Sequence, residues 1–244
     1  MVARVDDTRE QVVGKRYQVL GLLGAGGMGQ VYRALDRLTG ETVALKRVAT
    51  SSFQPDSHQE LRLALAHEFQ ALAGLRHPNI IGVRDYAFAS AGQPYFTMEL
   101  LYNPRTLVAA GQLLATAAKV KLLLPVLHAL AYIHRRGIIH RDLKPGNILV
   151  SGQVVKVLDF GLATLSGQST PPSGTLRYMA PEVLQGAAAT IAADLYAVGV
   201  IAYELLAGWH PFAPTGHAVS TERLLSLEPD WSYVDLEPPL IAVL

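Results

Sequence analysis

Five short segments of this 244-residue chain stand out, and four of them carry residue types suited to chemistry on phosphates. The first is the cluster Gly24-Ala25-Gly26-Gly27-Met28-Gly29. Such a cluster suits phosphate binding because glycines let backbone N–H groups approach phosphate oxygens without a Cβ in the way. A G-x-G-x-x-G pattern alone also occurs in plain tight turns and dinucleotide sites. A dinucleotide site has a helix after the glycines, whereas here the strand-like run from Val31 to Leu35 follows. The cluster therefore predicts the tip of a hairpin that folds over phosphates.

A lysine ends the second segment, Val43-Ala44-Leu45-Lys46. A lysine in an apolar strand is unusual unless its ammonium has a partner, and Glu68 on the following helix is a candidate. The alternative is a lysine whose stem packs on the strand while its ammonium extends to solvent.

The third segment, from Ile139 to Leu149, places two basic residues, an acid, a lysine and an amide between apolar elements. Asp142 can accept a hydroxyl proton there, and the amide oxygen of Asn147 can bind Mg²⁺. The alternative is a surface loop of salt bridges.

The fourth segment is Asp159-Phe160-Gly161, directly after the run Val154–Leu158. A carboxylate at a strand end suits a metal ligand, although Asp-x-Gly also occurs in ordinary turns. The fifth segment, Ala180-Pro181-Glu182, carries no chemistry by itself.

The elements that must position these residues change in type along the chain. Hydrophobic alternation predicts strands first, and apolar residues at helical spacing then predict helices. The predicted strands are 17–23, 30–35, 41–48, 82–88, 95–101, 148–150 and 154–158, and the predicted helices are 61–75, 116–135 and 192–206. A strand-rich first part and a helix-rich second part predict an α+β protein with two lobes. The domains we expect are an N-terminal extension over 1–16 and lobes over 17–101 and 102–244.

Composition excludes several classes of protein. Half the residues are hydrophobic, which supports a sizeable core. The net charge of +1 gives no basis for a nucleic-acid surface. The chain has no cysteine, so disulfides, thiol nucleophiles and cysteine-ligated metals are excluded. Early acidic residues argue against a signal peptide, and the apolar run 191–207 is interrupted by charge, so we expect a buried helix there and no membrane segment in this chain. A cytoplasmic location is the expectation, and an anchor elsewhere in a longer parent protein is compatible with it.

Taken in order, the five segments form the protein-kinase signature. The chain resembles the Hanks-type protein kinases from about Tyr17 to its last residue, and the tract Gly26–Ala34 is most similar to the bacterial serine/threonine branch. Lys144 after His-Arg-Asp-Leu, and Gly174-Thr175 before Ala-Pro-Glu, resemble serine/threonine rather than tyrosine kinases. The resemblance implies a two-lobed fold, with an antiparallel sheet and one main helix in the N-lobe and a mostly helical C-lobe.

The resemblance also implies a role for individual residues. Lys46, paired with Glu68, would hold the α- and β-phosphates of ATP, and Asp142 would orient the substrate hydroxyl and accept its proton. Lys144 would contact the γ-phosphate, supported by Thr175. Asn147 and Asp159 would hold Mg²⁺, or Mn²⁺ in its place. The ATP-binding positions are Leu23, Gly24, Gly26, Gly29, Val31, Ala44, Lys46, Met98, Glu99, Leu101 and Leu149, with Met98 as gatekeeper and Glu99 and Leu101 as hinge residues.

Family resemblance further implies regulation and partners. Leu72, Val83, His140 and Phe160 match the side-chain stack that couples the lobes, and Asp194 matches its anchor. Arg141 would pair with a phosphorylated activation loop, for which Ser169, Thr170 and Ser173 are the preferred acceptors among Thr164, Ser166, Ser169, Thr170, Ser173 and Thr175. The partners expected are protein substrates and ATP, with a homodimer for trans-autophosphorylation.

One departure from the family lies near Leu244. We expect the last helices of the C-lobe to be missing, which would leave Glu182 without its usual arginine and expose apolar surface on the helix 192–206. Two alternatives to an active serine/threonine kinase follow, a nucleotide-binding pseudokinase and a truncated interaction domain. A small-molecule phosphotransferase is disfavoured by the Gly-Thr to Ala-Pro-Glu segment.

Overall fold

The chain divides into two compact units, described here from a computed structural model that covers residues 12–26, 29–48, 69, 73–89, 92–159, 176–213, 221–226 and 228–229. Unit 1 comprises the described parts of Met1–Leu75 and Gly82–Leu101. Unit 2 comprises those of Arg76–Ile81, Tyr102–Thr164 and Gln168–Leu244.

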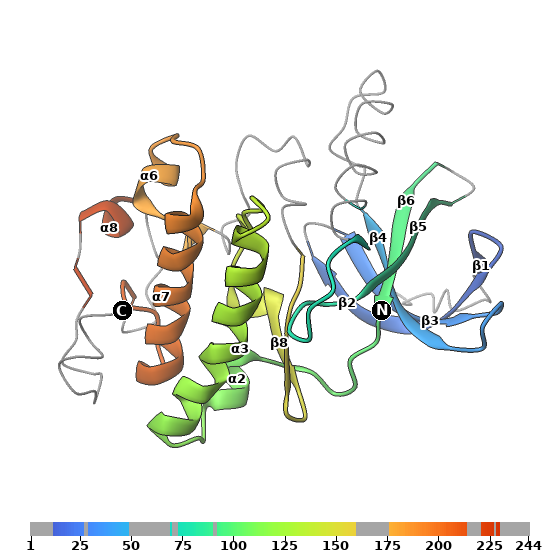
Figure 1. The fold of residues 1–244 in the computed structure, drawn as a ribbon, viewed down its shortest axis with the longest axis horizontal. Coiled ribbons are helices and arrows are strands. Elements are labelled where there is room, and N and C mark those ends of the chain that lie inside the picture. The colour runs from blue at the N-terminus through green and yellow to red at the C-terminus, as the bar shows by residue number, and fades with distance from the viewer. Residues whose placement is uncertain are drawn as a thin grey trace, which may run out of the picture. The chain divides into compact units, whose positions relative to one another are not determined.

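Unit 1 is an antiparallel sheet of six strands (Figure 1). The strands are β1 (Val12–Val13), β2 (Tyr17–Gly26), β3 (Gly29–Asp36), β4 (Thr42–Val48), β5 (Val83–Phe88) and β6 (Pro94–Glu99). They lie in the order β1-β2-β3-β4-β6-β5. One face of the sheet carries a cluster of buried side chains, namely Val13, Tyr17, Ala34, Val43, Leu45 and Tyr95.

Charged side chains tie three strands of this sheet together. The Arg16 guanidinium donates two hydrogen bonds of 2.7 Å to the buried Asp36 carboxylate and a third, of 3.0 Å, to Asp85. The Tyr17 hydroxyl donates to the same Asp85 oxygen at 3.0 Å. The Arg16 hydrogen bonds hold the pKa of Asp36 well below its usual range. The start of β2, the end of β3 and β5 are therefore fixed to one another.

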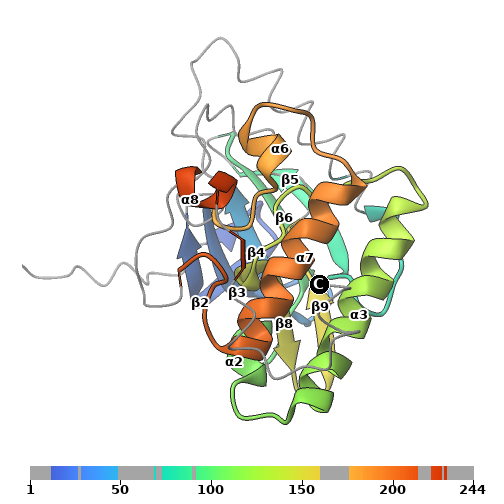
Figure 2. The same cartoon turned by 90° about the vertical axis from the view of Figure 1, so that its left-hand side faces the viewer.

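Unit 2 combines helices with a small three-stranded sheet. Its strands are β7 (Arg105–Thr106), β8 (Ile148–Ser151) and β9 (Val154–Val157), in that order. The helices are α2 (Leu107–Gly111), α3 (Thr116–His134), the 3-10 turn η2 (Pro145–Asn147), α6 (Pro181–Leu184), α7 (Ile191–Ala207) and α8 (Thr221–Ser226). Figure 2 shows α3 and α7 side by side, and α3 also packs on β9.

Helix α7 forms the centre of unit 2. Eight of its residues are buried, including the carboxylate-bearing Asp194. The helix ends at Gly208, whose φ of 89° is in the left-handed region and whose N–H donates to the Glu204 carbonyl. Ile191 and Leu195, in the first turns of this helix, are 45% and 49% exposed.

Among the described residues, α3 is the one helix long and apolar enough to cross a membrane. Length and composition alone are weak evidence for a membrane span, because core helices of folded domains meet the same criteria. Five α3 residues are buried within unit 2: Leu123, Val126, Ala129, Leu130 and Ile133. The helix therefore serves as a core helix of this unit.

The predicted α+β class is confirmed, and so are the main strands and the helices 116–135 and 192–206, each within a few residues. Of the predicted helix 61–75, Phe69 and Ala73 are helical and most other positions lie outside the described residues. The short elements β1, β7, α2, α6 and α8 were not predicted from the sequence. They span only two to six residues each, too few for a hydrophobic period to show.

His210, in the loop after α7, is a buried histidine that is held neutral. Its Nδ1 accepts the Phe212 N–H, and its Nε2 lies 2.9 Å from the Arg177 carbonyl, to which it can donate. Burial lowers the pKa of His210 to about 4. The histidine thus links the loop after α7 to the segment before α6.

We expect the stability of the domain to fall as the pH drops from 7 to 5, in part through His210. The unfolded histidine takes up a proton near pH 6.5 and the folded one only near pH 4, so acid favours the unfolded state, by about 2 kcal/mol at pH 5. Urea unfolding at pH 7 and pH 5 would measure the free energy of unfolding of the wild type and of His210→Gln. The free energy should change less with pH in His210→Gln, and an equal change in the two proteins would contradict the prediction.

Candidate active site

The β2–β3 hairpin carries the predicted phosphate-binding glycines in unit 1. Gly24 pairs with Val31 and Gly26 with Gly29, and register shifts interrupt β2 near Gly21 and Gly24. A Cβ built on Gly24 or Gly26 would meet no described atom within 4 Å. Gly29 has a φ of 126°, where glycine is favoured. Packing in the described part of the chain therefore does not explain Gly24 and Gly26, whereas close approach of a ligand would.

Strand register places several predicted ATP-binding residues on one face of the unit 1 sheet. Val43 and Leu45 belong to the core cluster, so Ala44 and Lys46 lie on the opposite face because side chains alternate along a strand. Ala44 pairs with Met98, and Lys46 pairs with Val31 and Phe96. These partners share the face of Ala44 and Lys46. Ala44 and Met98 are also buried, at 6% and 4% exposure.

Lys46 is buried on that face, with 3% of the residue exposed. Its Nζ lies 5.8 Å from the centre of the Phe96 ring, within range of a cation–π interaction. The alternative that the ammonium extends to solvent is wrong, because the side chain is enclosed. Glu68, its predicted partner, lies outside the described residues.

Glu99 and Gly82 are joined through two hydrogen bonds at the end of β6. The Glu99 N–H donates to the Gly82 carbonyl at 2.9 Å, and the Glu99 Oε1 accepts the Gly82 N–H at 2.8 Å. The Glu99 N–H is therefore already used within unit 1. Leu101, the second hinge residue, is half-buried, and Leu23 is 52% exposed.

In unit 2, Asp142 is a buried carboxylate that accepts hydrogen bonds on both oxygens. Its residue exposure is 1%. Lys144 Nζ lies 3.0 Å from Oδ1 and 2.8 Å from Oδ2, and Asn147 Nδ2 lies 2.9 Å from Oδ2. Asn147 Nδ2 also donates to the Asp142 carbonyl at 2.7 Å. Three of the predicted catalytic and metal-binding residues thus form one hydrogen-bonded group.

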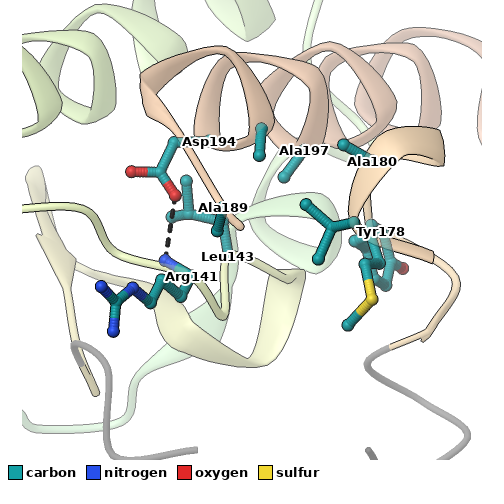
Figure 3. A pocket seen from close by; sticks show the side chains of 10 residues that line it. Arg141, Leu143, Tyr178, Ala180, Ala189, Asp194 and Ala197 are labelled. Carbon is teal, nitrogen blue, oxygen red and sulfur yellow. Dashed lines mark hydrogen bonds between the residues drawn. The ribbon is translucent and has the colours of Figure 1, made fainter. Parts of the chain in front are cut away.

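Asp194, on the first turn of α7, holds the backbone that precedes Asp142. Its Oδ2 accepts the His140 N–H at 2.8 Å and its Oδ1 accepts the Arg141 N–H at 3.0 Å. Figure 3 shows the Arg141 side chain directed away from Asp194 while its backbone nitrogen bonds to the carboxylate. Arg141 has a φ of 67°, an unfavourable region for a residue with a Cβ. The two hydrogen bonds therefore stabilise a strained loop.

His134 supplies a further hydrogen bond to Asp194. Its Nε2 lies 2.8 Å from Oδ2 of the carboxylate, and its side chain is only 10% exposed. Sequence reasoning did not identify His134. The signal available was a histidine at the end of an apolar helix, six residues before His140, and that position alone does not reveal its partner.

His140 is fully buried and connects the loop to the strand before Asp159. Its Nδ1 accepts the Asp142 N–H at 3.3 Å, which leaves Nε2 to carry the proton and donate to the Leu158 carbonyl at 2.9 Å. Burial lowers the pKa of His140 despite the nearby carboxylates of Asp194 and Asp142. The neutral ring therefore bridges Asp142 and Leu158.

Asn147 and Asp159 are the residues predicted to supply oxygen ligands to a metal. Asn147 uses its Nδ2 on Asp142, so its Oδ1 remains to act as a ligand. The Leu158 N–H donates to the Asn147 carbonyl at 2.9 Å, which brings the chain just before Asp159 alongside Asn147. No group of three or more metal-binding side chains occurs among the described residues. Two oxygen ligands fit Mg²⁺, which usually completes its shell with water and substrate phosphates.

A small cavity lies under this loop (Figure 3). It is lined by Arg141, Leu143, Tyr178, Met179, Ala180, Val183, Ala189, Ala193, Asp194 and Ala197. Its volume of about 20 Å³ holds little more than one water. Near it, the buried Tyr178 hydroxyl donates to Glu204 at 2.7 Å, which joins the segment before α6 to α7. The cavity is too small for a nucleotide.

Several predicted residues are not described in this structure. Glu68, Leu72, Phe160, Thr175 and the other activation-loop residues from 161 to 175 lie outside the described residues. Val83 is buried in unit 1 and His140 in unit 2. Leu149 is half-buried in β8. Glu182 lies in α6, where its charge contributes to raising the pKa of Tyr196, after the larger effect of burial.

Comparison with known proteins identifies the family. The family model "Protein kinase domain" matches residues 17–230, which is most of the chain. The chain belongs to the protein kinase family. The kinase domain is 35% identical over 210 residues to the probable serine/threonine-protein kinase PknB of Lactococcus lactis, covering 83% of this chain and 33% of that protein. It is 40% identical over 214 residues to the DNA damage-responsive serine/threonine-protein kinase RqkA of Deinococcus radiodurans, covering 81% of this chain and 30% of that protein.

A solved structure supports the same conclusion. The crystal structure of a cysteine-to-alanine mutant of the PknI kinase domain of Mycobacterium tuberculosis matches with a TM-score of 0.68 and 27% identity, over 88% of this chain and 83% of that one. The predicted protein kinase fold and the resemblance to bacterial serine/threonine kinases are therefore confirmed. This kinase domain spans about a third of the length of the curated relatives named above.

We expect Asp194→Asn to destabilise the kinase domain by about 3 kcal/mol, because the amide turns one acceptor into a donor facing a backbone N–H. His134→Gln, which keeps a donor, should cost less than about 1 kcal/mol. Urea unfolding would measure both, with the exposed-site variant Glu228→Gln as the control. Equal stability of Asp194→Asn and wild type would show that the carboxylate does not hold the loop.

Proposed function

We propose that this kinase domain transfers the γ-phosphate of ATP to serine and threonine hydroxyls of proteins. The observation that carries the proposal is the hydrogen-bonded group of Asp142, Lys144 and Asn147. The loop that leads into this group is anchored on Asp194 through the backbone N–H groups of His140 and Arg141. A buried carboxylate beside an ammonium and an amide is an arrangement suited to phosphoryl transfer, which depends on positioning and charge stabilisation rather than on a covalent nucleophile.

Asp142 is the proposed base. A carboxylate offers about four lone-pair positions, and three are used by Lys144 and Asn147. The remaining position can accept a hydrogen bond from the substrate hydroxyl and direct its oxygen at the γ-phosphorus. The proton passes to Asp142 as the new O–P bond forms and the bond to the leaving β-phosphate oxygen breaks.

The positive charge that the proposed reaction needs would come from two lysines, Lys144 and Lys46. Lys144 can move from Asp142 to the γ-phosphate, where its ammonium balances the charge of the transferred group. Lys46 would bind the α- and β-phosphates, with Glu68 as its proposed partner. Mg²⁺, held by Asn147 and Asp159, would supply further neutralisation of phosphate charge when bound, and Mn²⁺ has the same ligand preference for oxygen.

The nucleotide would lie against the face of unit 1 that carries Val31, Ala44 and Met98. Leu149 is a further apolar residue that we assign to the adenine, and the hinge backbone of Glu99 and Leu101 would bond the adenine edge. Gly24, Gly26 and Gly29 would bring backbone N–H groups to the phosphates. ATP and Mg²⁺ are abundant in the cytoplasm, which is where we place the reaction.

Autophosphorylation is the proposed regulation. Arg141 is exposed and its side chain points away from α7, so a phosphate on Ser169, Thr170 or Ser173 could pair with it. Thr175 would instead support Asp142 and Lys144. Two copies of the domain would phosphorylate each other, each acting as the substrate of its partner.

We expect Asp142→Asn to lower phosphate transfer about 10² to 10⁴-fold, because the amide cannot accept the hydroxyl proton. The assay follows labelled phosphate from ATP with Mg²⁺ to the domain itself and to a generic basic protein. Glu228→Gln is the control for an exposed carboxylate-to-amide change. Mapping the label by mass spectrometry tests the activation-loop acceptors in the same samples.

The outcomes separate the alternative functions. No transfer by the wild type with nucleotide still bound would indicate a pseudokinase. Neither transfer nor nucleotide binding would indicate an interaction domain, as would the lack of a cooperative thermal transition.

The glycine hairpin gives a second test. Gly26→Val should leave the free energy of unfolding within about 1 kcal/mol of wild type, since its side chain meets no described atom. It should weaken ATP binding about tenfold or more by keeping the backbone from the phosphates. Titration with a fluorescent ATP analogue measures the affinity. The control is Gly40→Val in the β3–β4 turn, which replaces a glycine of positive φ outside the hairpin and should leave ATP affinity unchanged. Unchanged ATP affinity in Gly26→Val would remove the hairpin from the nucleotide site.

A further inference from the structure

The short segment 176–180, which leads into α6, has a backbone that is fixed from two sides. The Arg177 carbonyl lies 2.9 Å from the His210 Nε2, which can donate to it. The neighbouring Tyr178 hydroxyl donates to Glu204 of α7 at 2.7 Å. The Arg177 side chain therefore extends from a backbone whose position is set by α7 and by the loop that follows it.

The Arg177 guanidinium makes no hydrogen bond or ion pair with another residue in the part of the chain that the structure describes. Arg16, by contrast, binds the carboxylates of both Asp36 and Asp85. The Arg177 Nε is buried, whereas the residue as a whole is partly exposed. The inner part of the side chain is thus enclosed by protein, and its outer part is open to a ligand.

The positive charge of Arg177 acts on the aromatic side chains beside it. After the larger effect of burial, this charge lowers the pKa of His210. Burial and Glu204 raise the pKa of Tyr178, and the charge of Arg177 opposes that rise. The Glu204 carboxylate accepts the Tyr178 hydroxyl rather than a hydrogen bond from the guanidinium. The charge of Arg177 is therefore available to an anion that binds at this segment.

This segment lies beside the loop that carries the proposed base. Tyr178 lines the small cavity together with Arg141 and Leu143, the two residues that flank Asp142 (Figure 3). All of these residues belong to unit 2. An extended peptide advances about 3.3 Å per residue. If a substrate hydroxyl binds at Asp142, Arg177 is therefore within reach of a side chain roughly two to four residues away along the peptide.

We propose that Arg177 selects protein substrates that carry a glutamate or aspartate a few residues from the serine or threonine that is phosphorylated. The guanidinium fork would bind the carboxylate through two parallel hydrogen bonds. Because the inner part of the side chain is already enclosed, binding would restrict little further motion. The inference rests on the proposed function, since it concerns the substrate of the same reaction.

The test is steady-state phosphorylation of short peptides by the 244-residue chain with ATP and Mg²⁺. Each peptide has one central serine in a background of alanine. A single glutamate is placed in turn at each position from about four residues before the serine to about four after it, which covers the reach of Arg177 on either side. For every peptide, kcat and KM are measured separately.

We expect glutamate at one or two of these positions to lower KM about tenfold relative to the alanine peptide, with little change in kcat. A contact remote from the reacting atoms is made before and during transfer alike, so it appears in KM. In Arg177→Gln the ratio of the two KM values should fall to about one. In Arg177→Glu, lysine should replace glutamate as the preferred residue at the same position.

Arg105→Gln, which removes the charge of an exposed arginine in β7 of the same unit, is the control and should keep the wild-type ratio. Thermal melts confirm that each variant is folded. An equal fall of the ratio in Arg105→Gln and Arg177→Gln would overturn the proposal, because it would indicate non-specific charge attraction.

Three further results would overturn the proposal. Equal KM values for all peptides with the wild type would do so while leaving the proposed function intact. An unchanged ratio in Arg177→Gln, with kcat lowered for acidic and alanine peptides alike, would assign Arg177 to a phosphate on the activation loop of this chain instead. No transfer by the wild type to any peptide or to the generic basic protein would contradict the proposed function, and this inference with it.

Discussion

The interaction on which the proposed site depends is the hydrogen bonding of one buried carboxylate, Asp194, to the loop that carries Asp142. Asp194 receives two backbone N–H groups and lies within 2.8 Å of the His134 ring nitrogen. A buried carboxylate is costly unless its oxygens are satisfied, and here the loop that satisfies them is held at a backbone angle that Arg141 would otherwise avoid. The hydrogen bonds from His140 and Arg141 thus offset both the cost of burying the charge and the cost of straining the loop. Because eight residues of α7 are buried, the loop is tied to a helix that is well packed in unit 2.

From that anchor, the rest of the site follows through short connections. His140 spans from Asp142 to the Leu158 carbonyl, and Asn147 spans from Asp142 to the Leu158 N–H. Both links are made by neutral groups, so they position Asp142 and the start of the Asp159 segment without adding charge. The charged groups that remain, Asp142, Lys144 and Asp159, are those assigned to substrate, phosphate and metal. Neutral groups thus position the site while charged groups are assigned to the reaction. This division follows from the packing and is not evident from the composition of the loop.

The sequence predicted the fold class, the main strands and the two long helices, because each has a hydrophobic period long enough to be recognised. The ordered motifs likewise predicted Asp142, Lys144 and Asn147, which the structure brings into one hydrogen-bonded group. His134, Tyr178 and His210 were not predicted to have the contacts they make. Each acts on a residue far along the chain, such as Asp194 or Glu204, and a single sequence gives no sign of which distant group a buried polar side chain meets. The short elements β7 and α2 arise from tertiary packing, since two to five residues carry too little local preference to form alone.

The three hydrogen bonds that the Asp142 carboxylate accepts also bear on which hydroxyl it can activate in the proposed reaction. Lys144 and Asn147 occupy most of its lone pairs while no substrate is bound, so a passing water molecule finds a base whose acceptor positions are largely taken. A peptide hydroxyl arrives with many other contacts and can displace the lysine toward the phosphate, whereas a water molecule brings none. In the proposed reaction, the hydrogen bonds that hold the base in position would therefore also disfavour hydrolysis of ATP by water.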